Sequence, residues 1–280
     1  MNIQNLLNYS EKLLDDNSNS TVTLDSEILL GKVIKKNREY LILNSQTELP
    51  KVKTKLFKSL VERRKKGEPI SYIVEKKEFW KKDFFVNKNV LIPRPDSEIL
   101  VEEVLKTFDN NSKKNILDIG TGSGCLILSL LNERRNFFGT AIDISKNALN
   151  VASFNAKVHQ LSNRVKFYYS DVDKFLLGKY DIIISNPPYI KKSKIKYLDR
   201  CIASYEPRIA LDGGHDGYSK IKKVITGASK LIKKNGKLFL EIGFDQRNFV
   251  VNILKKNGFY INKTRKDLGM NDRCIISTKL

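Results

Sequence analysis

The tetrapeptide Asn186-Pro187-Pro188-Tyr189 has the residue types best suited, in this sequence, to holding a planar amino group. The two prolines fix φ and stiffen the turn, so that the Asn186 side chain and the Pro187 carbonyl can present two hydrogen-bond acceptors in fixed directions. Tyr189 adds an aromatic face on which a flat amide or a base can stack. A Pro-Pro pair after a strand is by itself most often a simple turn, so the interpretation depends on the segments that accompany it.

A second group of candidate residues is the loop Gly120-Thr121-Gly122-Ser123-Gly124, which follows an apolar run and Asp118. Glycines let a backbone turn tightly and approach a ligand with no Cβ in the way. A dinucleotide-binding G-x-G-x-x-G pattern would need glycine at position 125, where Cys125 stands. Asp118 would repel a pyrophosphate but could accept hydrogen bonds from the cationic methionine end of S-adenosylmethionine. Asp143, at the end of the next expected strand, is placed to hydrogen-bond ribose hydroxyls.

These residues belong to a regular alternation of strands and helices that begins near residue 115. Strands are expected at 115–119, 137–142, 165–169, 180–185, 237–242 and 274–277, and helices at 125–131, 146–158, near 218–232 and around 246–256. Alternating strands and helices predict βαβ units and an α/β fold with a mostly parallel, doubly wound sheet. Open sheets of this kind bind ligands at the carboxyl ends of their strands, where the glycine loop, Asp143 and Asn186 are all expected.

The first 70 residues have a different pattern. Three apolar stripes at helical spacing predict a small helical bundle over 1–70, whose third helix ends in the basic run 63–66 before Gly67. Aromatic and β-branched residues then predict an extended or hairpin linker over 71–92. The remaining segment, 93–280, is the expected catalytic domain, and the bundle is expected to recognise the substrate.

Composition limits the kind of protein this is. At 280 residues the chain is long enough for two domains. The charge balance of 51 − 31 = +20 would attract phosphates or an acidic partner, but Lys-rich composition also arises without selection for binding, and both interpretations stay open.

Three scattered cysteines and two histidines predict no metal site and a reduced, cytoplasmic protein. The sequence shows no signal peptide and no apolar run of about 18 residues, so neither secretion nor membrane insertion is expected.

The tetrapeptide follows strands that carry a glycine loop and a strand-end acid typical of cofactor binding. In this combination the sequence resembles the NPPY-type S-adenosylmethionine-dependent amino methyltransferases. Within them it is most similar to the protein-(glutamine-N5) methyltransferases that modify peptide chain release factors. The resemblance covers nearly the whole chain, through blocks at 67–72, 78–80, 91–98, 186–189, 205–211, 214–217, 267–269 and 272–273. It implies a Rossmann-like, seven-stranded class I methyltransferase sheet.

The resemblance also implies roles for individual residues. S-adenosylmethionine, with S-adenosylhomocysteine as product, is expected to bind Gly120, Thr121, Gly122, Ser123, Gly124, Asp143, Asp171, Val172 and Asn186. The substrate is expected to bind Asn186, Pro187, Pro188 and Tyr189, of which Asn186, Pro187 and Tyr189 carry the catalysis. Val172 departs from relatives that have a larger aromatic residue on the adenine side. Arg94 and Glu98 match a family block, and structural and catalytic roles are equally open for them.

The activity implied is methylation of a glutamine side chain in class I release factors, supporting translation termination, with no stable nucleic-acid partner and no membrane. Two alternatives remain. An adenine-N6 methyltransferase of nucleic acid shares the tetrapeptide and would use the +20 charge, but no separate target-recognition domain is evident. A basic RNA-binding module with a vestigial cofactor fold would bind RNA in a salt-sensitive way and would not respond to S-adenosylmethionine.

Overall fold

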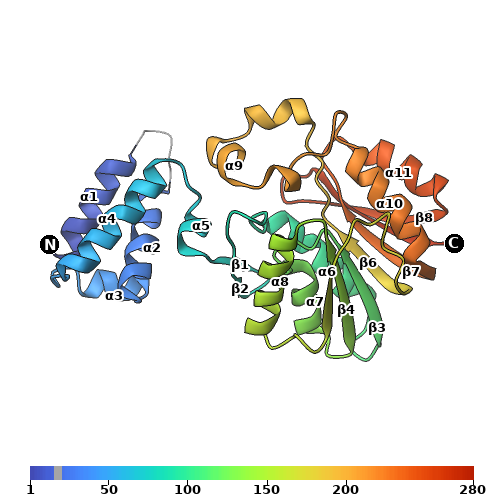
Figure 1. Ribbon diagram of the computed structural model, residues 1–280, viewed down its shortest axis with the longest axis horizontal. Helices are drawn as coiled ribbons and strands as arrows, with labels where there is room; N and C mark the ends of the chain where they lie inside the picture. The colour runs from blue at the N-terminus through green and yellow to red at the C-terminus, as the bar shows by residue number, and fades with distance from the viewer. Residues whose placement is uncertain (16–20) are drawn as a thin grey trace. The chain divides into compact units, whose positions relative to one another are not determined.

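The computed structural model describes residues 1–15 and 21–280, which form two compact units (Figure 1). The first unit is Met1–Lys76 together with Asp199–Tyr205. The second is Lys77–Leu198 with Glu206–Leu280. The short segment 199–205 therefore packs with a part of the chain more than a hundred residues before it, where Tyr205 Oη donates a hydrogen bond of 3.1 Å to the Lys66 carbonyl.

The first unit is a helical bundle, as the apolar stripes predicted. Its helices are α1 (Ile3–Leu14), α2 (Val22–Ile34), α3 (Arg38–Leu43), α4 (Lys51–Lys65), α5 (Ile70–Val74) and α9 (Arg200–Tyr205). The buried faces of α1 to α5 meet in one apolar core that includes Leu6, Leu30 and Phe57, whereas α9 has no buried residue. In the basic run that ends α4, Arg63 pairs with Glu68 and Arg64 pairs with Asp25. These two arginines thus stabilise the bundle rather than form a free cationic patch.

A short hairpin begins the second unit. Strands β1 (Lys77–Phe79) and β2 (Lys82–Phe84) pair antiparallel around Trp80 and Lys81, which both have positive φ. This two-residue turn has the twist that hairpins favour. The hairpin is shorter than the expected 71–92 segment because residues 70–74, directly after Pro69, continue as helix α5. After β2, the chain runs without a regular strand to the 3-10 helix η1 (Pro95–Ser97) and to α6 (Glu98–Thr107).

The second unit contains the seven-stranded sheet that the resemblance implied, in the order β5-β4-β3-β6-β7-β9-β8. The strands are β3 (Lys114–Ile119), β4 (Phe137–Asp143), β5 (Val165–Tyr169), β6 (Tyr180–Ser185), β7 (Ile232–Glu241), β8 (Phe259–Lys266) and β9 (Asp272–Lys279). The first five pair in parallel, and β9 runs antiparallel to β7 and β8. The sequence pattern did not predict β8, because this edge strand is mostly polar and exposed after its buried first residue.

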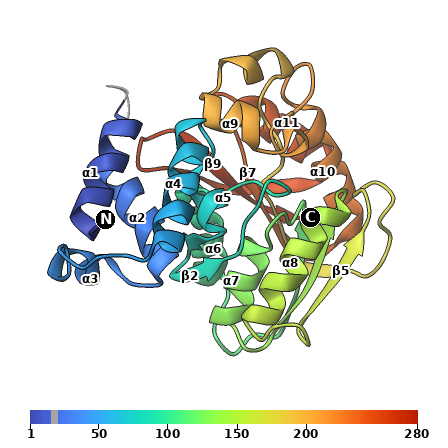
Figure 2. The ribbon, with the colours of Figure 1, turned by 60° about the vertical axis from the view of Figure 1, so that its left-hand side comes forward.

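Helices cover both faces of the sheet (Figures 1 and 2). Helices α6, α7 (Cys125–Glu133) and α8 (Lys146–Val158) pack against one face, and α10 (Ser219–Leu231) and α11 (Arg247–Lys256) pack against the other. Successive residues of β3 alternate between the two cores, Ile116 in the first and Leu117 in the second. Between β6 and α10 lie η2 (Lys192–Tyr197) and η3 (Arg208–Ala210). None of the helices in the described ranges combines the length and the apolar character that a membrane crossing needs.

Candidate active site

The glycine loop connects β3 to α7 at the carboxyl edge of the sheet. Gly120 and Gly122 have φ of +74° and +56°, and a Cβ built on either would meet nothing within 4 Å. Both glycines therefore border open space. Gly124 has a different role: with φ of +81°, its Cβ would lie 3.0 Å from Leu128 and 3.3 Å from Ala152, so glycine here allows α7 and α8 to pack closely.

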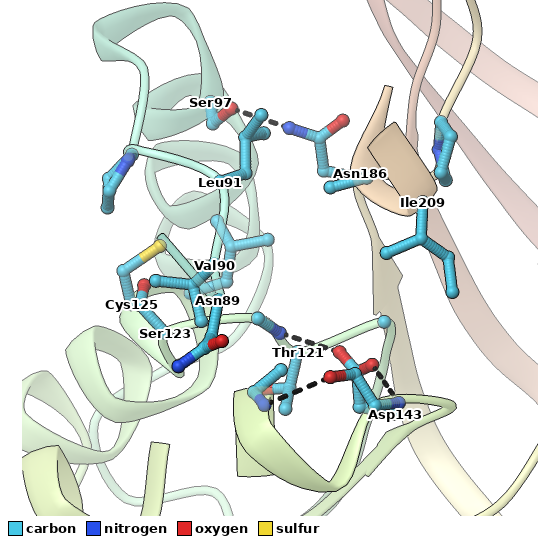
Figure 3. A pocket seen from close by; sticks show the side chains of 18 of the residues that line it. Asn89, Val90, Leu91, Ser97, Thr121, Ser123, Cys125, Asp143, Asn186 and Ile209 are labelled. Carbon is cyan, nitrogen blue, oxygen red and sulfur yellow. Dashed lines mark hydrogen bonds between the residues drawn. The ribbon is translucent and has the colours of Figure 1, made fainter. Parts of the chain in front are cut away.

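Asp143 holds the loop from the end of β4. Its Oδ2 accepts a 3.0 Å hydrogen bond from the Gly122 N–H, and its Oδ1 accepts a 2.9 Å bond from the Ser145 N–H (Figure 3). Burial raises the pKa of this carboxyl despite the two donors. Each carboxylate oxygen retains a further lone pair for a ligand hydroxyl.

Asp118 lies near the end of β3, just before the glycine loop. It is fully buried, and its Oδ2 accepts a 2.7 Å hydrogen bond from the Thr121 hydroxyl. Burial raises its pKa to about 7, and within the described residues Oδ1 has no hydrogen-bond partner. The side chain does not line either of the two cavities described below, so direct contact with a cationic ligand group stays a prediction. Within the protein, Asp118 supports the loop through Thr121.

The tetrapeptide follows β6, which runs next to β3 in the sheet. The Asn186 Nδ2 donates a 2.9 Å hydrogen bond to Ser97 Oγ, as Figure 3 shows. Ser97 in turn donates a 2.6 Å bond to Glu241 Oε2. Tyr189 Oη lies 3.4 Å from Glu241 Oε1. Among the described residues, no hydrogen bond reaches Asn186 Oδ1 or the Pro187 carbonyl, so both acceptors lack a protein partner.

Glu241 ends β7 and is fully buried, which raises its pKa to about 7. Burial, and secondarily this neighbouring carboxylate, also raises the pKa of Tyr189. The sequence reasoning did not single out Ser97 or Glu241. A signal for Glu241 was present, because it is an acid at the carboxyl end of the apolar run 238–242. Ser97 stood inside the family block that held Arg94 and Glu98, without a feature that set it apart.

Two adjoining cavities bring the expected residues together. The first spans about 840 Å³ of empty space, part of which is open solvent. The second spans about 530 Å³, also partly open solvent. Expected site residues that line the first are Gly120, Thr121, Gly122, Ser123, Asp143, Asn186 and Pro188, and those that line the second are Gly120, Asp143, Asp171, Val172, Pro187 and Pro188. Gly124 and Tyr189 line neither cavity.

The second cavity has a charged rim and a tightly packed wall. Asp171 forms an ion pair with Lys223, which also lies 3.0 Å from Asp173. Val172 is buried against α10, where a Cβ on Gly227 would approach it to 2.4 Å. A larger aromatic residue at position 172 would therefore need room that this helix does not leave.

Arg94 and Glu98 both make structural contacts. The Glu206 carboxylate pairs with Arg94 and also accepts a 3.2 Å bond from the Ile92 N–H. Glu98 accepts a 2.8 Å bond from the Trp80 N–H and so fixes the hairpin turn. Arg94 additionally lines the first cavity, whereas Glu98 does not.

Comparison with known proteins identifies the family. The model of the PrmC N-terminal domain matches residues 5–74, and the model of the methyltransferase small domain matches residues 96–213. A release factor glutamine methyltransferase of Clostridium acetobutylicum is 38% identical over 282 residues, which cover 100% of this chain and 99% of that protein. The chain belongs to the release factor glutamine methyltransferase family. The family member of Buchnera aphidicola is 37% identical over 100% of this chain and 99% of its own.

Other similarities are partial. A bifunctional methyltransferase of Rickettsia bellii is 36% identical over 98% of this chain, which spans only 54% of that protein. A crystal structure of a methyltransferase from Pyrococcus furiosus matches with a TM-score of 0.52 and 22% identity, over 70% of this chain and 88% of that one. This last similarity shows the fold alone. The predicted fold class and the predicted family are both confirmed.

Proposed function

We propose that this protein transfers the methyl group of S-adenosylmethionine to the side-chain amide nitrogen, N5, of a glutamine in class I peptide chain release factors. The observation that carries the proposal is the hydrogen bonding of the Asn186 side-chain amide. Its NH₂ group is bound to Ser97, and among the described residues neither its Oδ1 nor the neighbouring Pro187 carbonyl has a partner. Asn186 lines the first cavity and Pro187 the second. Two acceptors in fixed directions fit the two N–H bonds of a primary amide.

The two cavities fit the cofactor. Gly120 and Gly122 leave the space beside the loop free of side chains, and Asp143 offers carboxylate lone pairs for ribose hydroxyls. Asp171 and Val172 would lie on the adenine side, in the second cavity. When bound, the cofactor supplies a sulfonium-activated methyl group, which an amide nitrogen can accept.

The residues of the tetrapeptide would act by positioning. An amide nitrogen is a weak nucleophile because its lone pair is delocalised into the carbonyl. Acceptors at Asn186 Oδ1 and Pro187 O favour a more pyramidal nitrogen and aim its lone pair along the line of the methyl–sulfur bond. Tyr189 lines neither cavity and its hydroxyl bonds Glu241, so stacking of its ring on the flat amide stays a prediction. Catalysis would thus depend on preorganised dipoles and orientation, and the surplus proton would leave the nitrogen after transfer.

The first unit is proposed to grip the protein substrate. One glutamine in a pocket supplies too little contact to select one protein, so a second surface is needed. Among the described residues of the bundle, the large apolar side chains that are most exposed are Ile42, Leu43 and Val52, at 62%, 83% and 80%. Replacing Leu43 and Val52 with serine should lower kcat/KM on an intact release factor several-fold and leave the rate on a short glutamine peptide unchanged. Equal losses on both substrates would contradict this role.

The experiment that tests the activity is a comparison of acceptors. The protein and methyl-labelled S-adenosylmethionine are incubated separately with a release factor, total RNA and DNA. We expect label in the release factor alone, with the added 14 Da on a glutamine side chain by mass spectrometry. Label in DNA or RNA would instead favour the adenine-N6 alternative, and no label in any acceptor would contradict the proposed function.

A further inference from the structure

We propose that Ser97 and Glu241 are positioning residues that determine which end of the Asn186 amide faces the substrate, and that methyl transfer requires Glu241 in its ionised form. This inference rests on the proposed function. It adds two residues and a protonation state to the tetrapeptide, neither of which the sequence pattern supplied.

The direction of the hydrogen bonds follows from the donors available. An ionised carboxylate only accepts, so the 2.6 Å contact between Glu241 Oε2 and Ser97 Oγ uses the single proton of the serine hydroxyl. Ser97 Oγ then has only lone pairs left. Of the two ends of the Asn186 amide, only the NH₂ can bond an oxygen that accepts, across 2.9 Å. Oδ1 must therefore point away from Ser97, toward the substrate.

A neutral Glu241 removes this constraint. The protonated carboxyl can donate to Ser97 Oγ, which frees the serine hydroxyl to donate to Asn186 Oδ1. The amide is then able to rotate by half a turn and present its NH₂ to the substrate amide. Two NH₂ groups facing each other cannot form a hydrogen bond, so the neutral state loses the acceptor that orients the nucleophile.

The surroundings of Glu241 favour a titration near neutral pH. Glu241 and Ser97 are 2% and 3% exposed, and burial raises the pKa of the carboxyl to about 7. The groups facing it are Tyr189 from the loop after β6, Arg273 and Cys274 from β9, Asp96 from η1, and Cys125 from α7, whose thiol is also kept neutral by burial. Arg273 stays cationic and favours the ionised form, and burial raises the pKa values of Tyr189 and Cys274, which keeps both neutral. Asp96 opposes ionisation but pairs with Arg273 at 3.5 Å.

The test uses the full chain with three site variants and one matched control. Ser97→Ala removes the hydroxyl, Ser97→Thr retains it, and Glu241→Gln keeps the size of the side chain but not its charge. Ser129→Ala is the control, because Ser129 is a fully buried serine on α7 outside the site. The readouts are kcat with saturating cofactor and release factor, KM, cofactor affinity by calorimetry, melting temperature, and the pH profile of kcat from 5.5 to 9.

We expect kcat to fall about 10- to 100-fold in Ser97→Ala and Glu241→Gln, the range for a small misplacement of a reacting group, while cofactor affinity stays within about twofold. Ser97→Thr should restore most of kcat, and Ser129→Ala should match the wild type. The wild-type kcat should decrease as pH falls through about 7, and this acid limb should disappear in both Ser97→Ala and Glu241→Gln.

Any other outcome contradicts the inference that Ser97 and ionised Glu241 orient Asn186. Unchanged kcat in Ser97→Ala and Glu241→Gln would show that Asn186 needs no partner. Parallel losses of kcat, cofactor affinity and melting temperature would show a purely structural contact. An acid limb that persists in Glu241→Gln would belong to another group and would contradict the requirement for an ionised Glu241. If the wild type does not methylate a release factor, the proposed function itself is contradicted. The other outcomes contradict only the roles of Ser97 and Glu241, so the two cases can be distinguished.

Discussion

Two buried carboxyl groups, Asp118 and Glu241, lie behind the two halves of the candidate active site, and each accepts a short hydrogen bond from a serine or threonine hydroxyl. Asp118 supports the glycine loop through Thr121, at 2.7 Å and three residues away in the sequence. Glu241 supports the tetrapeptide through Ser97, at 2.6 Å and 144 residues away. Burial raises the pKa of both to about 7. The chemistry of the two supports is similar, but one is local and the other joins distant segments.

The difference separates two ways of building a binding site. The loop is held mainly by contacts within β3, β4 and the loop itself, and α8 adds one hydrogen bond of 2.8 Å from Asn155 Nδ2 to the Ser123 carbonyl. The tetrapeptide has a stiff backbone of its own, but its Asn186 side chain is oriented only after η1 and the end of β7 come together. We therefore expect changes in the loop to act mainly on cofactor affinity and changes around the tetrapeptide to act mainly on kcat.

Gly122→Asp should give the largest effect and test the loop. A Cβ at this position has open space, so the damage comes from a carboxylate placed in the cavity next to Asp143. An added unpaired charge of this kind should weaken S-adenosylmethionine binding by about 10³-fold or more in calorimetry. Gly122→Ala, which has the same strained φ of +56° and no charge, is the control and should retain most of the affinity. Undiminished binding by Gly122→Asp would move the cofactor elsewhere.

Asn186→Ala should lower single-turnover methylation by about 10²- to 10³-fold, the cost of removing one preorganised partner of a transition state. Because the loop is held independently, cofactor affinity should change far less than the rate. Rapid quench with labelled cofactor measures the rate, and calorimetry measures the affinity. A folded variant with a rate near that of the wild type would show that the tetrapeptide does not orient the amide.

Asp143→Ala should weaken cofactor binding by ~1–3 kcal/mol, the contribution of a charge-assisted hydrogen bond, with kcat at saturation little changed. The variant also frees the Gly122 and Ser145 N–H groups, so a small loss of thermal stability accompanies it. Asp143→Asn, which keeps an acceptor, should lose less affinity. If both variants bind as tightly as the wild type, the ribose partner is another residue.

Asp118→Asn should give the smallest effect, on stability alone. The folded state raises the pKa of Asp118 to about 7, above its unfolded value, so the native protein holds the proton more tightly than the unfolded chain does. This stabilisation is complete below the unfolded pKa and is lost as pH rises through about 7. The variant lacks this titration. Its free energy of unfolding minus that of the wild type should therefore be more positive at pH 8 than at pH 4 by at least ~1 kcal/mol, measured by urea titrations. A difference independent of pH would mean that Asp118 is ionised in the fold.

The sequence alone determined the parts of this protein whose residues are contiguous or periodic. Glycines 120, 122 and 124, the acid at the end of β4 and the tetrapeptide after β6 were readable because strand periodicity places them at one edge of a parallel sheet. The helical bundle was readable from its apolar stripes. Strand β8 was not, because an exposed edge strand carries little apolar pattern.

The tertiary structure alone decided which side chains support that edge. Strand order brings the end of β7 beside β6, and the turn at η1 brings Ser97 between Glu241 and Asn186, a juxtaposition that no spacing in the sequence encodes. The same holds for Glu98, which fixes the hairpin turn, and for residues 199–205, which join the first unit. A hydrogen bond between distant segments depends on how the whole chain packs, whereas a glycine turn or a proline pair depends on the local backbone.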